Sequence, residues 1–264
     1  MGLYNNRIVV KVGTSTLTND AGKSDLRTTD RLACVLSDIQ NMGYEVVLVS
    51  SGAIAVGRNK LNMTAKPDSM RMKQAAAAVG QCSLMYLYDK FFGDYDKTVA
   101  QILLNADDIE EEEKKENLIN TFNALLEMGV IPIVNENDSV SYKEIESEDR
   151  LFGDNDMLSA VVAVLCRAKH LVIFSDIDGF YDHDPRLYPN AQLIDQIDTI
   201  DDSVYALAGG AGSRRGTGGM RTKLQAASLA TSQGTNTIVT NGKRPEVLYD
   251  IVKGGRVGTL FPGK

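Results

Sequence analysis

Histidine is scarce in this sequence. Of 264 residues only two are histidines, His170 and His183. A Ser-His-Asp or Cys-His catalytic triad is therefore not expected, and a metal site built from several histidines is impossible. The chemistry that this chain performs must depend on lysines, carboxylates and backbone amides.

Cysteine, long apolar runs and basic charge are also in short supply. Cys34, Cys82 and Cys166 lie far apart and match no zinc-binding spacing, so we predict three reduced, buried thiols. No apolar run approaches the ~20 residues that cross a bilayer, and the N-terminus has no secretory pattern. The net charge of −7 argues against a general nucleic-acid binder. We therefore expect a cytoplasmic protein that binds neither nucleic acid nor membrane.

What the chain does contain is an alternation of Val- and Ile-rich strands with amphipathic helices. Strands are predicted over 7–12, 45–49, 99–104, 130–134, 171–174 and 236–240. Helices are predicted over 32–43, 70–92 with a break at Gly80, 118–128, 156–166, 220–232 and 245–252. Short apolar strands between such helices indicate an α/β protein with a parallel sheet covered on both faces.

No linker, repeat or low-complexity tract divides the chain, so we predict a single domain over residues 1–264. The acidic run 107–113 is followed by two lysines. Because Glu110–Lys114 and Glu111–Lys115 would each be four residues apart on a helix, we interpret the run as a solvated helix face rather than a binding patch.

Three of the predicted strands end in small residues. Gly13-Thr14-Ser15 follows the first strand, Ser50-Ser51-Gly52-Ala53 the second and Ser175-Asp176 the fifth. Ligands bind at the carboxyl edge of a parallel sheet, where small residues let backbone amides approach an anion. Each turn alone is a weak signal, because steric needs also explain it.

The segment 209–223, GGAGSRRGTGGMRTK, is a glycine-rich loop that leads into a predicted helix. Such a loop presents unpaired N–H groups and the positive end of the helix dipole to a phosphate, and Arg214, Arg215, Arg221 and Lys223 add charge. A flexible loop with a solvated basic patch is the alternative. The Walker A, GxGxxG and HRD patterns do not occur, which argues against the usual P-loop NTPases, nicotinamide-dependent oxidoreductases and protein kinases.

Lys11 is a charge inside an apolar strand, VVKVG. A buried lysine is costly unless it meets an anion. Lys11 therefore either lies on an edge strand with its ammonium in water, or points to the carboxyl edge of the sheet. In the second case it and Lys223 could flank a transferring phosphoryl group, with Asp156 between them keeping both charged.

Two clusters of Asn and Asp also stand out, Asn135 to Asp138 after a strand and Asp154 to Asp156 at the start of a helix. Helix capping explains part of the second cluster. These groups could otherwise hold the ammonium and carboxylate of an amino acid, or water around Mg²⁺. A carboxylate acceptor is already ionised at neutral pH and needs no base, so a phosphotransferase that acts on a carboxylate fits a site without histidine.

Six motifs together resemble the amino acid kinase family, and within it the enzymes that make γ-glutamyl phosphate for proline synthesis. They are VVKVGTSTLT at 9–18, VSSGAIAVG at 49–57, VNENDSV at 134–140, GDNDMLSA at 153–160, FSDIDGFYDHDPR at 174–186 and GTGGMRTK at 216–223. The resemblance implies an open αβα sandwich and the ATP- and Mg²⁺-dependent phosphorylation of the γ-carboxylate of L-glutamate. We further expect feedback inhibition by proline, a homo-oligomer and hand-over of the product to a glutamyl phosphate reductase.

The resemblance also implies roles for individual residues. Lys11 and Lys223 match the lysines that stabilise the transferring phosphoryl group, and Asp156 matches the aspartate that organises them. Ser51, Asp138 and Asn155 match glutamate-binding positions, and we hypothesise that Asp138 contacts the α-ammonium group. The nucleotide-binding positions are Ser175, Asp176, Thr217, Gly218, Gly219, Met220, Arg221, Thr222 and Lys223. No residue is assigned to a metal.

Two features depart from the family pattern. Many members carry a small C-terminal PUA domain, which we do not expect here, and the segment 139–153 is longer than usual and could act as a lid. Alternative functions are transfer to N-acetylglutamate, aspartate or a nucleoside monophosphate, or a non-catalytic amino acid or nucleotide sensor. The presence of both lysines and Asp156 favours catalysis over sensing, since binding alone would not need paired lysines.

Overall fold

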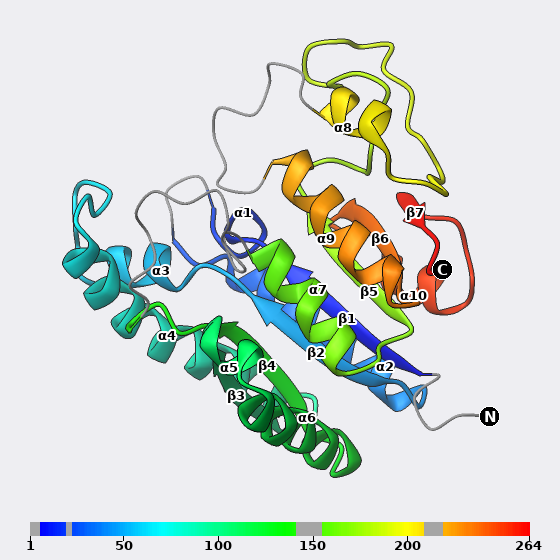
Figure 1. Ribbon diagram of the computed structural model, residues 1–264. Coiled ribbons are helices and arrows are strands. Elements are labelled where there is room, and N and C mark those ends of the chain that lie inside the picture. Colours follow the sequence, from blue (N-terminus) through cyan, green and yellow to red (C-terminus); the bar gives the residue numbers. More distant parts are fainter. Residues whose placement is uncertain (1–5, 20–22, 141–154, 209–218) are drawn as a thin grey trace.

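The structure is a computed structural model that describes residues 6–19, 23–140, 155–208 and 219–264 (Figure 1). A seven-stranded sheet in the order β3-β4-β2-β1-β5-β6-β7 forms its centre. The strands are β1 (Arg7–Val12), β2 (Glu45–Ser50), β3 (Val99–Leu104), β4 (Ile131–Glu136), β5 (His170–Ser175), β6 (Asn236–Asn241) and β7 (Thr259–Phe261). Only β7 is antiparallel to its neighbour, β6. The predicted mainly parallel sheet is confirmed.

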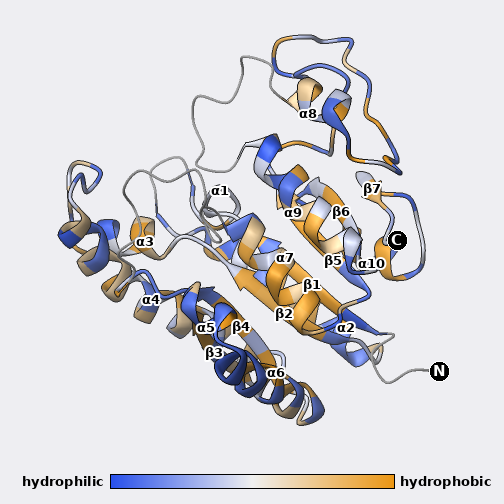
Figure 2. Cartoon of the chain, in the orientation of Figure 1, coloured by the Kyte–Doolittle hydropathy of each residue, from blue (hydrophilic) through white to orange (hydrophobic). Residues whose placement is uncertain are grey.

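Helices cover both faces of the sheet, as the predicted sandwich requires (Figure 1). One face packs against α6 (Glu112–Glu127), α7 (Asn155–Leu165) and α9 (Met220–Ser232), and the other against α2 (Leu26–Asn41), α4 (Met70–Gly93) and α10 (Val247–Val252). Shorter helices are α1 (Thr14–Leu17), α3 (Ala53–Lys60), α5 (Asp107–Glu110) and α8 (Asp202–Ala208). Figure 2 shows the hydrophobic residues concentrated in the central strands and in α7.

The central strand β1 places Lys11 on the face covered by α7 and α9. Every residue of β1 is buried. Because side chains alternate along a strand, Ile8 and Val10 face the α2 side, whereas Val9 and Lys11 face the opposite side. β1 lies between β2 and β5, so the edge-strand interpretation of Lys11 is wrong.

The chain reverses its direction of winding next to this strand. β1 leads to its neighbour β2 on one side, whereas β5, which pairs with β1 on the other side, leads to β6 further away. Ligands of parallel α/β sheets bind at the carboxyl ends of the strands at such a switch point. The ends of β1 and β5 are therefore the expected place for a site.

The helices α3 and α4 touch through two glycines. A Cβ built on Gly57 would lie 1.7 Å from the Ala76 carbonyl oxygen, and one built on Gly80 would lie 1.7 Å from the Ala53 carbonyl oxygen. The predicted helix break at Gly80 is wrong, because α4 runs unbroken from Met70 to Gly93. Gly80 allows backbone-to-backbone contact, which compensates for its low helix propensity.

The acidic run also differs in detail from the prediction. The ion pairs here join Glu111 to Lys114, at 2.7 Å, and Glu112 to Lys115, at 3.2 Å, so the spacing is three residues rather than four. The reason is that Glu111 has an extended backbone and separates α5 from α6. All of these side chains are at least partly exposed, which agrees with a solvated face.

Two further predictions concern the state of the cysteines and the absence of membrane-spanning segments. The three cysteines are free, as predicted, but only Cys166 is buried; Cys34 is partly exposed and Cys82 is exposed. Within the described part of the chain, no helix combines the length and the apolar character needed to cross a bilayer.

Candidate active site

Two lysines and one aspartate form a buried ionic cluster at the carboxyl end of β1. Lys11 Nζ lies 2.6 Å from Asp156 Oδ1, and Lys223 Nζ lies 3.1 Å from Asp156 Oδ2. The lysines are 5% and 7% exposed and the aspartate is fully buried. The structure thus brings together the three residues predicted to carry phosphoryl transfer, from β1, α7 and α9.

The charges of this cluster stabilise one another. Burial by itself raises the pKa of Asp156, but the two nearby ammonium groups outweigh it and hold that pKa below its ordinary value. A carboxylate that stays ionised keeps both lysines paired in a site where unpaired charges would be costly. Two positive charges and one negative charge leave the cluster with a net positive charge, which suits a phosphate group.

The start of α9 joins the same cluster. Thr222 Oγ1 donates to Asp156 Oδ2 at 2.9 Å, and Gly219 lies at the N-cap of the helix. Arg221 extends to the ring of Tyr205 on α8, with 5.9 Å between its guanidinium carbon and the ring centre. Met220 is half-buried beside them. The predicted nucleotide-binding residues Thr217 and Gly218, with Arg214 and Arg215, lie outside the described residues.

The predicted nucleotide-binding pair Ser175 and Asp176 lies at the carboxyl end of β5, the strand beside β1. Ser175 is largely buried and donates to Asp176 Oδ1 at 3.3 Å. The exposed Asp176 carboxylate lies 3.7 Å from Arg186. These residues therefore share the sheet edge of Lys11.

The predicted acceptor-binding residues Ser51 and Asn155 are in direct contact. Asn155 Nδ2 lies 2.7 Å from Ser51 Oγ, 3.1 Å from the Ser50 carbonyl oxygen and 3.1 Å from Asn135 Oδ1. Asn155 is the first residue of α7 and precedes Asp156, so this polar group lies directly beside the ionic cluster. The segment 141–154, which includes most of the suggested lid, lies outside the described residues.

Asp138, the third predicted acceptor-binding residue, lines a separate pocket of about 430 Å³. The pocket also contains Ala53, Gln81 and Asn137. Gln81 accepts a hydrogen bond from Asn135 Nδ2 at 2.9 Å, which connects the pocket wall to Asn155 and Ser51. The sequence offered no signal for Gln81, since one glutamine in a helix has no distinctive spacing.

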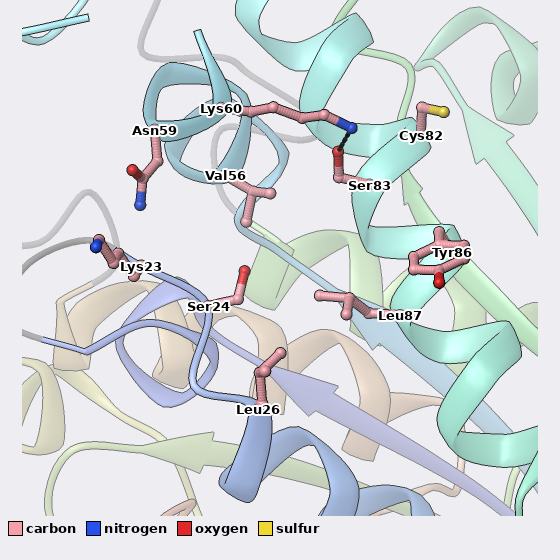
Figure 3. A pocket seen from close by; sticks show the side chains of 10 residues that line it. All are labelled: Lys23, Ser24, Leu26, Val56, Asn59, Lys60, Cys82, Ser83, Tyr86 and Leu87. Carbon is pink, nitrogen blue, oxygen red and sulfur yellow. Dashed lines mark hydrogen bonds between the residues drawn. The ribbon is translucent and has the colours of Figure 1, made fainter. Parts of the chain in front are cut away.

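A larger pocket, of about 660 Å³, lies between α3, α4 and the residues before α2 (Figure 3). Its wall includes Leu26, Val56, Tyr86 and Leu87, and Lys60 donates to Ser83 across it at 3.0 Å. None of the predicted site residues lines it. The ionic cluster and the smaller pocket therefore remain the candidate site.

Comparisons of this sequence with a family model and with known proteins agree on one family. The model of the amino acid kinase family matches residues 6–241. The chain is 55% identical to the glutamate 5-kinase of Clostridium perfringens over 98% of its own length and 96% of that protein. It is 51% identical to the glutamate 5-kinase of Listeria innocua over 98% of its length and 93% of that protein. Among solved structures, Giardia lamblia carbamate kinase bound to AMP-PNP matches with a TM-score of 0.67 at 17% identity, over 98% of this chain and 99% of that one.

Proposed function

The chain belongs to the amino acid kinase family, and from that premise we propose that it transfers the γ-phosphoryl group of ATP to the γ-carboxylate of L-glutamate. The product is γ-glutamyl phosphate, and the reaction is the first step of proline biosynthesis. The high identity to two glutamate 5-kinases over almost the whole chain supports this choice of acceptor. The fold and the ionic cluster support phosphoryl transfer itself.

Lys11 and Lys223 neutralise the charge of the phosphoryl group during transfer. Such transfer depends mainly on positioning and on fixed positive charge around the equatorial oxygens, rather than on covalent chemistry by the protein. Asp156 holds both ammonium groups in place through its two oxygens. The backbone N–H groups at the start of α9 add a partial positive charge for the nucleotide phosphates.

The acceptor is held by polar groups rather than activated by a base. A γ-carboxylate is ionised at neutral pH, so the reaction needs no proton abstraction. Ser51 binds this carboxylate beside the lysines, Asn155 contributes to the acceptor site through its hydrogen bond to Ser51, and Asp138 pairs with the α-ammonium group. N-acetylglutamate has no ammonium group, so the Asp138 carboxylate favours free glutamate over that acceptor.

Magnesium enters with the nucleotide, as the MgATP substrate. The described residues contain no group of three or more carboxylate, histidine or cysteine side chains placed to hold a metal ion. The buried carboxylate of the site is engaged by two lysines and a threonine. The described residues therefore do not fit a resident magnesium site, and no step is assigned to one.

The observation that carries the proposal is the pairing of both lysines with one buried carboxylate at the switch point of the sheet. The test is to incubate the protein with ATP, Mg²⁺, hydroxylamine and one acceptor at a time, because hydroxylamine traps an acyl phosphate as a hydroxamate. We expect hydroxamate with glutamate and much less with aspartate or N-acetylglutamate. Hydroxamate with N-acetylglutamate alone, or no hydroxamate with any of the acceptors, would reject the proposal.

The proposal extends to organisation and partners. Residues 1–264 act as one amino acid kinase domain that assembles into a homo-oligomer. Because an acyl phosphate hydrolyses readily, the product passes directly to a glutamyl phosphate reductase. Sedimentation of the protein alone and with such a reductase tests both statements.

A further inference from the structure

Four polar side chains form a continuous relay from α4 to the end of β2. Gln81 Oε1 lies 2.9 Å from Asn135 Nδ2, Asn135 Oδ1 lies 3.1 Å from Asn155 Nδ2, and Asn155 Nδ2 lies 2.7 Å from Ser51 Oγ. These residues belong to or directly follow α4, β4, α7 and β2. The relay therefore connects the wall of the smaller pocket to the edge of the ionic cluster.

Two backbone groups fix the direction of the hydrogen bonds. The Glu136 N–H can only donate, and the Asn135 atom 2.9 Å from it must be the oxygen. The Ser50 carbonyl can only accept, and the Asn155 atom 3.1 Å from it must be the nitrogen. Asn155 therefore donates both to Asn135 and to Ser51, Asn135 donates to Gln81, and Gln81 is the terminal acceptor of the relay.

This direction determines what Ser51 can offer to a ligand. Its oxygen accepts from Asn155, so its own hydroxyl hydrogen is left to donate elsewhere. A carboxylate has only acceptor atoms and pairs with a donor. We propose that Gln81 is a positioning residue that fixes the relay and so presents the Ser51 hydroxyl as a donor to the acceptor carboxylate; this inference rests on the proposed function.

Gln81 supplies the acceptor that the Asn135 amide nitrogen requires, and Asn135 cannot turn to find another one. Asn135 is 2% exposed, so without Gln81 its amide nitrogen would be buried without that acceptor. Rotation of the amide would place its nitrogen against the Glu136 N–H, which is also a donor. Gln81 follows Gly80 in α4, and the contact between Gly80 and the Ala53 carbonyl sets its distance from the site.

The test compares Gln81→Met, which removes the acceptor at nearly constant size, with Gln233→Met at the exposed C-cap of α9. We expect Gln81→Met to raise the KM for glutamate about 10-fold, with the KM for ATP within about twofold of wild type. Gln233→Met should change neither value by more than about twofold. An unchanged KM for glutamate, or an equal rise in both KM values, would overturn the proposal.

A second readout does not depend on activity. The side-chain amide NMR signals of Asn155, recorded without substrate, should shift in Gln81→Met and stay in place in Gln233→Met. Gln81→Glu keeps an acceptor oxygen and should leave these signals near their wild-type positions. It replaces Gln81→Met in this measurement if Gln81→Met does not fold. Unshifted signals in Gln81→Met would overturn the relay. A wild-type protein that forms no hydroxamate with glutamate would reject the proposed function, and these signals would still decide the relay.

Discussion

Lys11 and Lys223 bind opposite oxygens of the same buried carboxylate, Asp156, at 2.6 and 3.1 Å. Lys11 lies on β1 near the start of the chain and Lys223 lies on α9 near its end, so the arrangement exists only in the folded protein. Because the aspartate is shared, any change to one member alters the charge balance of the other two. The first predictions follow from that coupling.

Replacing either lysine by methionine should lower kcat at least ~10²-fold, by analogy with the removal of a transition-state donor. The KM for glutamate should change much less, since the lysines act on the transferring group. Steady-state kinetics of Lys11→Met and Lys223→Met measure both values. Lys253→Met, which alters an exposed lysine after α10, is the control and should keep wild-type kinetics. A Lys223→Met enzyme with normal kcat would remove that residue from catalysis.

Asp156→Asn should destabilise the protein by roughly 3 kcal/mol, because it leaves two buried ammonium groups without a counter-charge. Urea unfolding at pH 7 measures the loss. Asp94→Asn, at the exposed C-cap of α4, should change the free energy of unfolding by less than about 0.5 kcal/mol. Equal effects of the two substitutions would show that the buried cluster does not contribute to stability.

The same aspartate predicts a pH dependence with a definite sign. Its pKa in the folded protein lies below the ordinary value of 3.8, so its stabilising effect is complete above that value and is lost as pH falls through the lower, folded pKa. The stability difference between wild type and Asp156→Asn should therefore be constant near neutral pH and shrink in strong acid. Urea unfolding at a series of pH values tests this; a difference that grows in acid contradicts the assignment.

Asp138→Ala should raise the KM for glutamate about 10- to 100-fold, the effect of losing a hydrogen bond to a charged group. The KM for ATP should stay within about twofold, because Asp138 lies in the acceptor pocket. Initial-rate kinetics with each substrate varied separates the two values, with Asp94→Ala as the control. Equal increases in both KM values would defeat the assignment of Asp138 to the ammonium group.

Gly80→Ala should destabilise the protein by about 1–3 kcal/mol, because the new methyl group would collide with the Ala53 carbonyl oxygen. Gly93→Ala, at the last position of the same helix, has no atom within 4 Å of its added Cβ and should be neutral or stabilising by up to about 1 kcal/mol. Urea unfolding distinguishes the two. Similar values for both would mean that the helix contact is not tight.

The site residues that could be predicted from sequence are those whose residue type departs from the pattern of the surrounding segment. Lys11 is conspicuous because it interrupts an apolar strand, and the Asn- and Asp-rich clusters are conspicuous because capping alone does not need them. Gln81 has no such mark, and its partner Asn135 is 54 residues away in sequence. Only the folded chain shows that they meet.

The fold was predictable to a similar degree. Buried strands of Val and Ile and long amphipathic helices were correctly located, because burial produces their periodicity. The sequence does not predict the short α1, α3, α8 and β7, since a few residues do not establish a period. Gly80 was misread for a different reason: its low helix propensity is a local effect of about 1 kcal/mol, and the tertiary contact that only glycine permits outweighs it.

The backbone contact between α3 and α4 also limits how the enzyme can be redesigned. Ala53 and Gln81 line the pocket from these two helices, whose separation is set by main-chain atoms rather than by side chains. Trimming side chains between the helices cannot enlarge the space for a longer acid. Engineering a new acceptor should instead begin on the β3 wall, at Gln101 and Leu103, where a smaller residue opens room without disturbing the helix pair.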